Sequence, residues 1–347
     1  MQINQFLPNL SYGDAIGNDV IEIRDFLIKK GFESHIYVNA ACDKTKKYCK
    51  HYSQYKPNSK NRIIFHASIG SKMDDFLLKT KEKMILVYHN MTPAHYFKGI
   101  SDVHYRLLNE GNDNIRRFVK RTAIAIGDSD FNSDDLRKMG FKQVHTVPII
   151  VDYKKYDRTL NKILFDKLKD GFTNILFVSR VVPNKKHEDL LKTFFFYKKY
   201  INKKSRLIIV GNSEGMEAYQ EKLNVLTENL NLKDVWFTGM VPFEDLATYY
   251  KTAHIFLSMS EHEGFFVPLL ECMHLKVPIL AYKSTAVPYT LGNSGVMFTE
   301  KRYNEVAELI DIVLKNKIKI VKGQNERLKY FNQKNIQDIF FKVIQKI

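Results

Sequence analysis

The sequence is poor in cysteine, in tryptophan and in long apolar runs, and each shortage excludes a class of protein. The 347 residues include three cysteines and one tryptophan. Cys42, Cys49 and Cys272 form no C-x-x-C pair, so we expect neither a disulfide framework nor a zinc site. No apolar run approaches about 18 residues, and the opening MQINQFLPNL lacks a basic segment followed by an apolar core. We therefore expect a cytoplasmic protein that is neither secreted by this route nor membrane-spanning.

Acidic residues are also scarce relative to basic ones. Lysine and arginine number 54 against 38 aspartates and glutamates, which gives a net charge of +16. This excess implies an anionic partner, for which nucleic acid, an acidic membrane face and a phosphorylated substrate all qualify. A hydrophobic fraction of 44% supports folded domains, and the chain length favours two of them.

Short apolar runs alternate with amphipathic stretches along the chain, which is typical of repeated βα units in a largely parallel sheet. In the first half we predict strands at residues 1–7, 34–38, 62–66, 84–89, 123–127 and 143–147. A second series is predicted at residues 174–179, 206–211, 235–239, 254–258, 278–282 and 295–298. Pro148, Gly171 and the charges between them indicate a linker with a short helix.

Two doubly wound α/β domains facing each other across a cleft fit this layout. We expect an N-terminal Rossmann-like domain at residues 1–150, a linker at 151–172 and a second Rossmann-like domain at 173–330. Residues 331–347 are expected to form an amphipathic helix that can cross back to the first domain. Because such sheets bind ligands at the carboxyl ends of their strands, each motif is expected directly after a strand.

The stretch EHEGFFVPLLE, residues 261–271, follows one of these strands. Pro268 suits the first turn of a helix, so a helix is expected to begin near Phe266. Glu263 then lies in the loop, and the Glu271 side chain leans back toward the ligand end of the helix.

The backbone of this stretch is suited to an anion. Gly264 permits close approach of a ligand to the main chain. The N–H groups expected to point at a phosphate are those of Phe265, Phe266 and Val267. Carboxylates repel a phosphate, so their presence beside one needs an explanation. A carboxylate can accept two hydrogen bonds from a vicinal diol, so one acid could hold a ribose and the other a sugar ring. The alternative is that Glu271 only complements the helix dipole, worth roughly 0.3–1 kcal/mol.

Cations that could balance two phosphates follow the first strand of the second series. In VSRVVPNKKHEDLLKTF, Arg180 and Lys185 are separated by a turn that contains Pro183 and Asn184. Arginine offers a planar fork and lysine a mobile point charge. Taken alone, two such residues in a loop are more often solvated, and their coincidence with the acid pair favours a site.

With these motifs the second half resembles the family-4 retaining glycosyltransferases of the GT-B fold. The family carries an Arg and a Lys five residues on after the first strand, and a Glu-x7-Glu motif opening on EGF. The resemblance implies that Arg180 and Lys185 hold the diphosphate of the donor, that Glu271 binds its ribose, and that Glu263 with the adjoining amides meets the transferred sugar. Val241 is included among the donor-binding residues. One departure is Lys186, where many members carry glycine.

The first half resembles a surface-polysaccharide subgroup of these enzymes in SYGDAIGNDVIEIRDFL, HASIGS and YHNMTPAHYF. The resemblance implies that the loop with Gly13 and Gly17 contacts the donor phosphates, although as a bare pattern it is more often a simple turn. Asp14 and Asn18 could contact the acceptor or cap the helix. His89 ends a strand where family members place a histidine near the donor sugar, and His66 on the neighbouring strand is expected to support it.

Two further features have competing interpretations. Asp128 and Asp130 in GDSDFNSDDL could hold a metal, but the segment also suits a helix start, and no metal is expected. Residues 44–62 hold seven basic residues and no acid, interleaved with Tyr48, Tyr52 and Tyr55. This run is either a solvated loop or a patch that contacts anionic lipid, whereas no recognition module for nucleic acid accompanies it.

We therefore expect a retaining, metal-independent glycosyltransferase that needs no cofactor. It would transfer a mannose, glucose or galactose type of hexose from a nucleotide-diphosphate sugar to a glycan or lipid-linked acceptor, in the synthesis of a surface polysaccharide such as O-antigen or capsule. The catalytic residues expected are Glu263, His89, Arg180 and Lys185. A sugar-nucleotide epimerase of the same fold, or a basic non-catalytic protein that binds nucleic acid or membrane, remains as the alternative.

Overall fold

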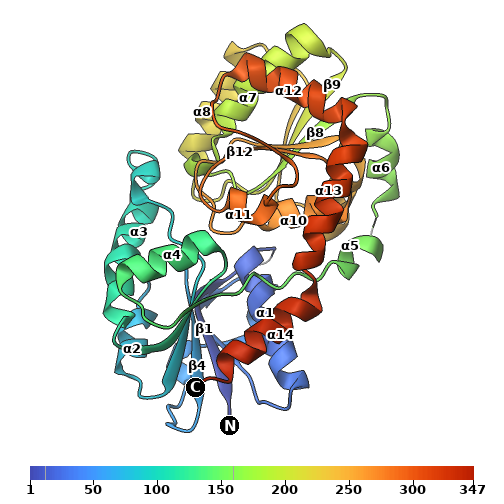
Figure 1. Cartoon of the computed structure of the whole chain (residues 1–347). Helices are drawn as coiled ribbons and strands as arrows, with labels where there is room; N and C mark the ends of the chain where they lie inside the picture. Colours follow the sequence, from blue (N-terminus) through green and yellow to red (C-terminus); the bar gives the residue numbers. More distant parts are fainter. Residues whose placement is uncertain (12, 159) are drawn as a thin grey trace. The chain divides into compact units, whose positions relative to one another are not determined.

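The computed structural model describes residues 1–11, 13–158 and 160–347, which form two compact units (Figure 1). Unit 1 comprises Met1–Lys98, Asp102–Asp152 and Phe331–Ile347. Unit 2 comprises Gly99–Ser101 and Tyr153–Tyr330. Each unit is built on its own parallel sheet, so the expected pair of doubly wound α/β domains is confirmed.

Unit 1 contains a seven-stranded parallel sheet in the order β3-β2-β1-β4-β5-β6-β7. Its strands are β1 (Ile3–Leu10), β2 (Ile36–Ala41), β3 (Cys49–His51), β4 (Arg62–Ala67), β5 (Lys83–Tyr88), β6 (Thr122–Gly127) and β7 (Val144–Thr146). Its α-helices are α1 (Ala15–Lys29), α2 (Met73–Lys79), α3 (Asp102–Ile115), α4 (Asp130–Met139) and α14 (Gln333–Ile344). Short 3₁₀ helices are η1 (Lys46–Tyr48), η2 (Tyr52–Gln54), η3 (Ala94–Phe97) and η4 (Arg116–Phe118).

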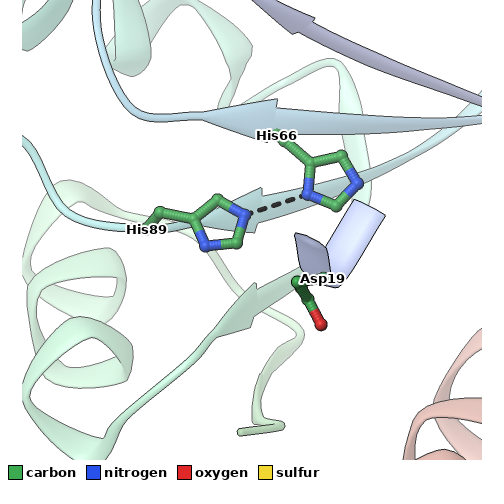
Figure 2. A group of neighbouring side chains, drawn as sticks. All are labelled: Asp19, His66 and His89. Atoms are coloured by element: carbon green, nitrogen blue, oxygen red, sulfur yellow. Dashed lines mark hydrogen bonds between the residues drawn. The ribbon is translucent and has the colours of Figure 1, made fainter. Parts of the chain in front are cut away.

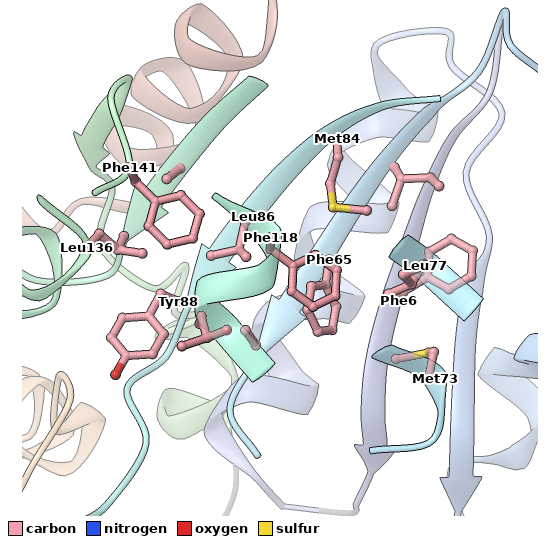
Figure 3. Packing of buried hydrophobic residues seen from close by; sticks show 14 of the residues in the cluster. Phe6, Phe65, Met73, Leu77, Met84, Leu86, Tyr88, Phe118, Leu136 and Phe141 are labelled. Atoms are coloured by element: carbon pink, nitrogen blue, oxygen red, sulfur yellow. The ribbon is translucent and has the colours of Figure 1, made fainter. Parts of the chain in front are cut away.

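Both faces of this sheet are buried, which explains why its strands are continuous apolar runs. Because successive side chains of a strand point to opposite faces, Phe65 and Leu86 belong to the core cluster that also contains Leu77 of α2 (Figure 3). Ile64 and Ile85 belong to the cluster on the other face. The helices therefore cover the sheet on both sides.

The C-terminal helix α14 completes the second of these clusters, together with α1 (Figure 1). Its buried residues Ile336, Phe340, Val343 and Ile344 are each 6% exposed or less. Burying an aliphatic or phenyl side chain contributes roughly 1.5–3 kcal/mol, so α14 is a substantial part of the stability of unit 1. The expected return of this helix to the first domain is confirmed.

Unit 2 contains a six-stranded parallel sheet in the order β10-β9-β8-β11-β12-β13. Its strands are β8 (Thr173–Val178), β9 (Ser205–Val210), β10 (Val235–Gly239), β11 (Ile255–Ser258), β12 (Ile279–Tyr282) and β13 (Val296–Phe298). Its helices are α5 (Lys154–Arg158), α6 (Lys162–Leu168), η5 (Pro183–Lys185), α7 (His187–Phe196), η6 (Tyr197–Ile201), α8 (Glu217–Asn229), α9 (Phe243–Thr252), α10 (Val267–His274), α11 (Val287–Leu291), α12 (Tyr303–Lys315) and α13 (Lys317–Tyr330).

Residues 44–62, interpreted above as either a solvated loop or a lipid-contacting patch, contain the short strand β3, which was not predicted. Tyr55 in this segment is 5% exposed and packs against the rings of Phe6 and Tyr37 at centroid distances of 5.0 and 5.1 Å. Tyr48 and Tyr52 also pack against core clusters. The segment has no apolar periodicity of its own, because β3 is an edge strand of three residues and the tyrosines that flank it pack against neighbouring cores.

Candidate functional site

The sheet of unit 2 changes direction of winding between β8 and β11, which are neighbours in the sheet but not in the sequence. Such a switch point leaves a crevice at the carboxyl ends of the two strands, where doubly wound proteins bind ligands. The loop after β8 carries Arg180 and Lys185, and the loop after β11 carries Glu263. The fold therefore puts three of the predicted residues at one edge of one sheet.

Several polar contacts join these two loops. The Lys185 ammonium lies 2.6 Å from Oε2 of Glu263. The Asn184 side-chain amide donates to the His262 carbonyl at 3.0 Å, and the Glu261 N–H donates to the Asn184 carbonyl at 2.9 Å. The spacing of the motifs gave no sign of this direct pairing between Lys185 and Glu263, which were assigned to different parts of a donor.

The backbone of Glu263 is held by hydrogen bonds, whereas one of its carboxylate oxygens has no donor among the described residues. Its backbone N–H donates to the Thr285 hydroxyl at 2.8 Å, and that hydroxyl donates back to the Glu263 carbonyl at 2.8 Å. Its side chain is 6% exposed, and Oε1 has no hydrogen-bond partner among the described residues. A buried carboxylate oxygen without a donor is costly, so a hydroxyl that reached this atom would relieve the cost.

Arg180 lies at the carboxyl end of β8 with an exposed side chain. In the described part of the chain its guanidinium forms no ion pair, which leaves the planar fork available to an anion. The backbone beside it is tightly held, because the Val181 N–H donates to the Asn212 carbonyl at 2.8 Å. Gly211 precedes that residue with φ +150°, and a Cβ there would overlap the carbonyl oxygen of Ser179. Sequence reasoning missed Gly211, although a glycine closing a buried strand was a visible signal.

The helix after Glu263 begins where it was predicted. Phe266 is its N-cap with φ +74°, and α10 runs from Val267 with Pro268 in its first turn. The side chains of Phe265 and Phe266 are 2% and 6% exposed, so they serve the core and leave the backbone of this segment to meet a ligand. Contact between these amides and a phosphate stays a prediction.

Glu271 has partners that the sequence did not reveal. The hydroxyls of Tyr156 in α5 and Tyr250 in α9 donate to its two carboxylate oxygens. Burial, and then the charge of Glu271, raise the pKa of both phenols well above the usual range, so they remain neutral donors. Glu271 lies beyond the first turn of α10, which removes the interpretation as a helix-dipole partner. A carboxylate has about four acceptor positions, so capacity for a ribose remains.

Other predicted and unpredicted residues surround this edge. Val241 is half-buried after β10, two strands away from β8, and stays a prediction. Lys186 has φ +54°, a left-handed conformation that accounts for glycine at this position in the resembling family. Its ammonium lies 3.3 Å from Glu261, which also pairs with Lys301 at 2.8 Å. Although burial opposes ionisation, Lys301 and then Lys186 lower the pKa of Glu261.

In unit 1 the glycine loop is explained locally. Gly13 has φ +76°, and the Asp14 side chain caps α1 by accepting from the Gly17 N–H at 3.2 Å. A Cβ on Gly17 would lie 3.1 Å from the Ser11 carbonyl oxygen, so the turn itself requires a small residue. The predicted contact of Gly13 and Gly17 with donor phosphates stays a prediction.

A buried chain of hydrogen bonds runs from Gln5 in β1 through His66 and His89 to Asp128, and Figure 2 shows its central bond, between the two histidines. Gln5 donates from its amide to the Val20 carbonyl at 2.9 Å, so its other end is the oxygen, which accepts from Nε2 of His66 at 3.0 Å. Nδ1 of His66 must then accept from Nε2 of His89, 2.9 Å away. Nδ1 of His89 donates to Asp128 at 3.2 Å. One arrangement of protons satisfies the chain, and it makes His89 an imidazolium.

The environment favours the same charges. Burial, and then the charge on His89, lower the pKa of His66 well below its usual range. Burial opposes charging of His89, but the hydrogen bond and charge of Asp128 outweigh it and raise its pKa. Burial raises the pKa of Asp19 to about 7, against the charge of His89 and the Ile150 N–H. The ligand atoms of Asp19, His66 and His89 lie within 4.8 Å of one another, and the two histidines satisfy each other without an ion.

This network changes the interpretation of His89. Its side chain is 1% exposed, and both ring nitrogens form hydrogen bonds within the protein. In this structure neither nitrogen is available to a sugar. Asp128 is committed to His89, whereas the Asp130 carboxylate accepts from Thr146 at 2.9 Å. The two aspartates of the D-x-D pattern therefore serve different partners. That catalysis needs no metal stays a prediction.

Comparison with known proteins places the chain in a family. Residues 161–335, half of the chain, match the family Glycosyl transferases group 1, and the chain belongs to that family. An uncharacterised glycosyltransferase of Methanocaldococcus jannaschii is 25% identical over 191 residues, which are 52% of this chain and 48% of that protein. The O-antigen chain mannosyltransferase B of Escherichia coli is 26% identical over 35% of this chain and 32% of its own length. The matches thus span at most about half of these relatives.

Solved structures show the same fold over the whole chain. HepE of Anabaena in complex with UDP-glucose has a TM-score of 0.78 at 14% identity, with all of both chains covered. WaaG, a glycosyltransferase involved in lipopolysaccharide biosynthesis, has a TM-score of 0.69 at 15% identity over 97% of this chain and 98% of its own. These similarities confirm the GT-B fold class, with two parallel-sheet Rossmann-like domains. In the described part of the chain, no helix has both the length and the apolarity needed to cross a bilayer.

Proposed function

We propose that the protein is a retaining glycosyltransferase that transfers a hexose from a nucleotide-diphosphate sugar to a saccharide acceptor. The observation that carries the proposal is the Lys185–Glu263 pair at the switch point of unit 2. One oxygen of Glu263 is neutralised by a cation, and the other is a buried acceptor without a donor. A cation for phosphate and an acceptor for hydroxyl are neighbours here, because the Lys185 ammonium lies 2.6 Å from Oε2, the other oxygen of the same carboxylate. This arrangement suits the junction between the diphosphate and the sugar of such a donor.

The residues of unit 2 divide the donor between them. The guanidinium of Arg180 and the ammonium of Lys185 hold the diphosphate, with the backbone of 264–267 on its other side. Oε1 of Glu263 accepts a hydroxyl of the sugar ring. Glu271, held in place by Tyr156 and Tyr250, accepts hydroxyls of the ribose.

The reaction then proceeds on one face of the sugar. The bond between the anomeric carbon and the diphosphate oxygen breaks as the acceptor hydroxyl oxygen forms its bond to the same carbon. The acceptor proton passes to the departing phosphate oxygen, and Arg180 and Lys185 stabilise the negative charge that develops there. These two cations neutralise the phosphates, so the proposed reaction requires no metal ion and no cofactor.

The acceptor and the cellular role are part of the proposal. Relatives named for O-antigen synthesis, and a structural relative named for lipopolysaccharide synthesis, support a glycan or lipid-linked acceptor in surface-polysaccharide assembly. The net charge of +16 supports an anionic partner, and the inner, anionic face of a membrane is proposed because no recognition module for nucleic acid accompanies the basic residues 44–62. The lysines of residues 44–62 are exposed, whereas Tyr55 is buried and Tyr48 and Tyr52 are half-buried.

Donor binding and turnover test this proposal. Calorimetry with a panel of nucleotide sugars identifies the donor, and NMR of the product gives its anomeric configuration, which should match the donor. Glu263→Gln and Lys185→Ala should each lower turnover at least about 100-fold, by analogy with loss of one preorganised stabiliser. Glu300→Gln is the matched control, because Glu300 is an exposed acid of the same unit that pairs with Arg302. Full turnover in both site variants would refute the proposal.

A sugar-nucleotide epimerase of the same fold is the second candidate. It would convert the donor in the absence of any acceptor, whereas a transferase would leave the sugar unchanged or hydrolyse it slowly. Incubation of the identified donor alone, followed by NMR of the sugar, separates the two. Activity that persists in excess chelator supports the metal-independent reaction.

A further inference from the structure

Unit 2 has a basic hollow of about 490 Å³ at the amino ends of β11 and β12. The end of α9, the loop before β12 and the first turns of α13 surround it. Its lining consists of Lys251, Ala253, Leu275, Lys276, Lys317, Ile318, Val321, Lys322 and Asn325. Because the strands are parallel, this edge of the sheet is opposite the edge that carries Glu263. An occupant of the hollow would leave the candidate donor site of unit 2 open.

The charges of this hollow are unbalanced. Four of its nine lining residues are lysines and none is acidic. Within the described residues, the ammonium groups of Lys276, Lys317 and Lys322 form no ion pair or hydrogen bond. Burial, and then the charge of Lys317, lower the pKa of the neighbouring His254, which reflects the positive potential here. Like charges around one concave surface raise the local potential and favour an anion there.

Nearby lysines behave differently. Lys315 at the end of α12 lies 2.6 Å from Asp311, and Lys329 near the end of α13 lies 2.5 Å from Glu326. These two cations are thus neutralised within their own helices, whereas the lining of the hollow contains no acid.

The hollow also has an apolar side. Ile318 is 89% exposed and lies between Lys317 and Lys322, and Val321 and Leu275 contribute further apolar surface. A free phosphate has no apolar surface that could pack against the exposed side chain of Ile318. A nucleic acid would favour arginine and stacking aromatic residues, and the lining contains neither. An anionic lipid surface matches both properties, because it offers phosphate groups at the level of the lysines and hydrocarbon beneath them.

We propose that this basic hollow docks unit 2 on a membrane surface that carries anionic phospholipid, with lipid phosphates among its lysines and Ile318 in the interface. The inference rests on the membrane association in the proposed function and assigns it to a surface. Residues 44–62 are the competing surface, which is also basic; its Tyr55 is buried, and its Tyr48 and Tyr52 are half-buried against core clusters.

Vesicle co-sedimentation of the full chain tests the assignment. The probes are vesicles of phosphatidylcholine alone and of phosphatidylcholine mixed with phosphatidylglycerol. Binding should require phosphatidylglycerol and weaken as salt is raised. Lys317→Glu/Lys322→Glu should lower the partition coefficient about tenfold or more, and Ile318→Ser should lower it by a smaller factor. Lys50→Glu/Lys56→Glu is the matched control, because it changes the charge equally on the competing surface and should retain most of the binding.

Several outcomes would overturn the proposal. Equal binding of the parent chain and Lys317→Glu/Lys322→Glu would do so, as would loss of binding in the control alone. If inorganic phosphate binds the parent but not the hollow variant while vesicles bind both alike, the hollow is a site for free phosphate. Calorimetric titration with the donor in the absence of vesicles keeps the two proposals separate, because the hollow variants should bind the donor like the parent. If the parent chain binds no donor, the proposed function is contradicted, and the vesicle result for the hollow still stands by itself.

Discussion

Nδ1 of His66 and Nε2 of His89 share one proton across 2.9 Å, at the carboxyl ends of two adjacent strands. Since the Gln5 oxygen takes the Nε2 proton of His66, the shared proton belongs to His89. Asp128 accepts the other His89 proton and balances the charge. The pair therefore combines a neutral and a charged imidazole in one buried network.

The first prediction concerns these protons. At neutral pH, ¹⁵N NMR should show His89 protonated on both nitrogens and His66 protonated on Nε2 alone. Asp128→Asn removes the carboxylate that raises the pKa of His89 while burial continues to lower it, so His89 should become neutral. Asp130→Asn is the control, because Asp130 accepts from Thr146 instead. A singly protonated His89 in the parent chain would contradict the assignment.

The second prediction concerns the tyrosines that hold Glu271. Tyr156→Phe and Tyr250→Phe should each lower the free energy of unfolding by about 1–3 kcal/mol, because each leaves a carboxylate oxygen of a buried group without its donor. Urea denaturation measures the effect. Tyr249→Phe on the same helix as Tyr250 is the control and should change stability little, since the Tyr249 hydroxyl forms no hydrogen bond among the described residues. Weaker donor binding in the two site variants would further support a ribose contact at Glu271.

The third prediction concerns Gly211. Gly211→Ala should destabilise unit 2 by more than about 3 kcal/mol, because its Cβ would overlap a backbone oxygen and backbone cannot move aside as a side chain does. Gly239→Ala at the next strand has a positive φ but open space, so it should cost only about 1–2 kcal/mol of left-handed strain. Thermal unfolding of both variants checks the contrast. Similar losses in the two would show that the loop after β8 is not held by this close approach.

The fourth prediction concerns acid stability. Burial, and then the charge of Lys185, lower the pKa of His187 to about 3 in the folded chain, against 6.5 unfolded. Between these values the unfolded chain binds more protons, so stability should fall as pH decreases, by up to about 1.4 kcal/mol per pH unit from this group. His187→Gln should make the dependence less steep in urea titrations below pH 6.5. An unchanged slope in His187→Gln would contradict this prediction.

Most of the fold could be predicted from the sequence, because each buried parallel strand is a short continuous apolar run and these runs alternate with amphipathic helices. The strands around Phe65 and Leu86 illustrate this, and Pro268 marked the start of α10. Strand β3 could not be found, because three residues at a sheet edge have no period. The first strand was predicted to end at residue 7, yet β1 continues to Leu10; the pairing with β4 ends at Phe6, so Pro8 needs no donor on that side.

The candidate site was only partly predictable. Spacing identified Arg180, Lys185 and Glu263, because motifs after strands keep their spacing. The partners of Glu271 come from Tyr156, 115 residues away, and Tyr250, so only the fold brings them together. The sequence marked His89 as a candidate but did not reveal its hydrogen bonds. These depend on Gln5, His66 and Asp128, which come from three other strands or loops.

The packing of α14 against α1 and the sheet of unit 1 has a consequence for synthesis. The ribosome delivers this helix about 180 residues after the last strand of that sheet, at roughly 5–20 residues per second. Until then Ile64, Ile85 and Val87 lack part of their apolar cover. While the second half is translated, the apolar residues of unit 1 that α14 covers therefore remain partly exposed to solvent. A nascent chain stalled before Gln333 should bind chaperones more strongly than the complete chain does.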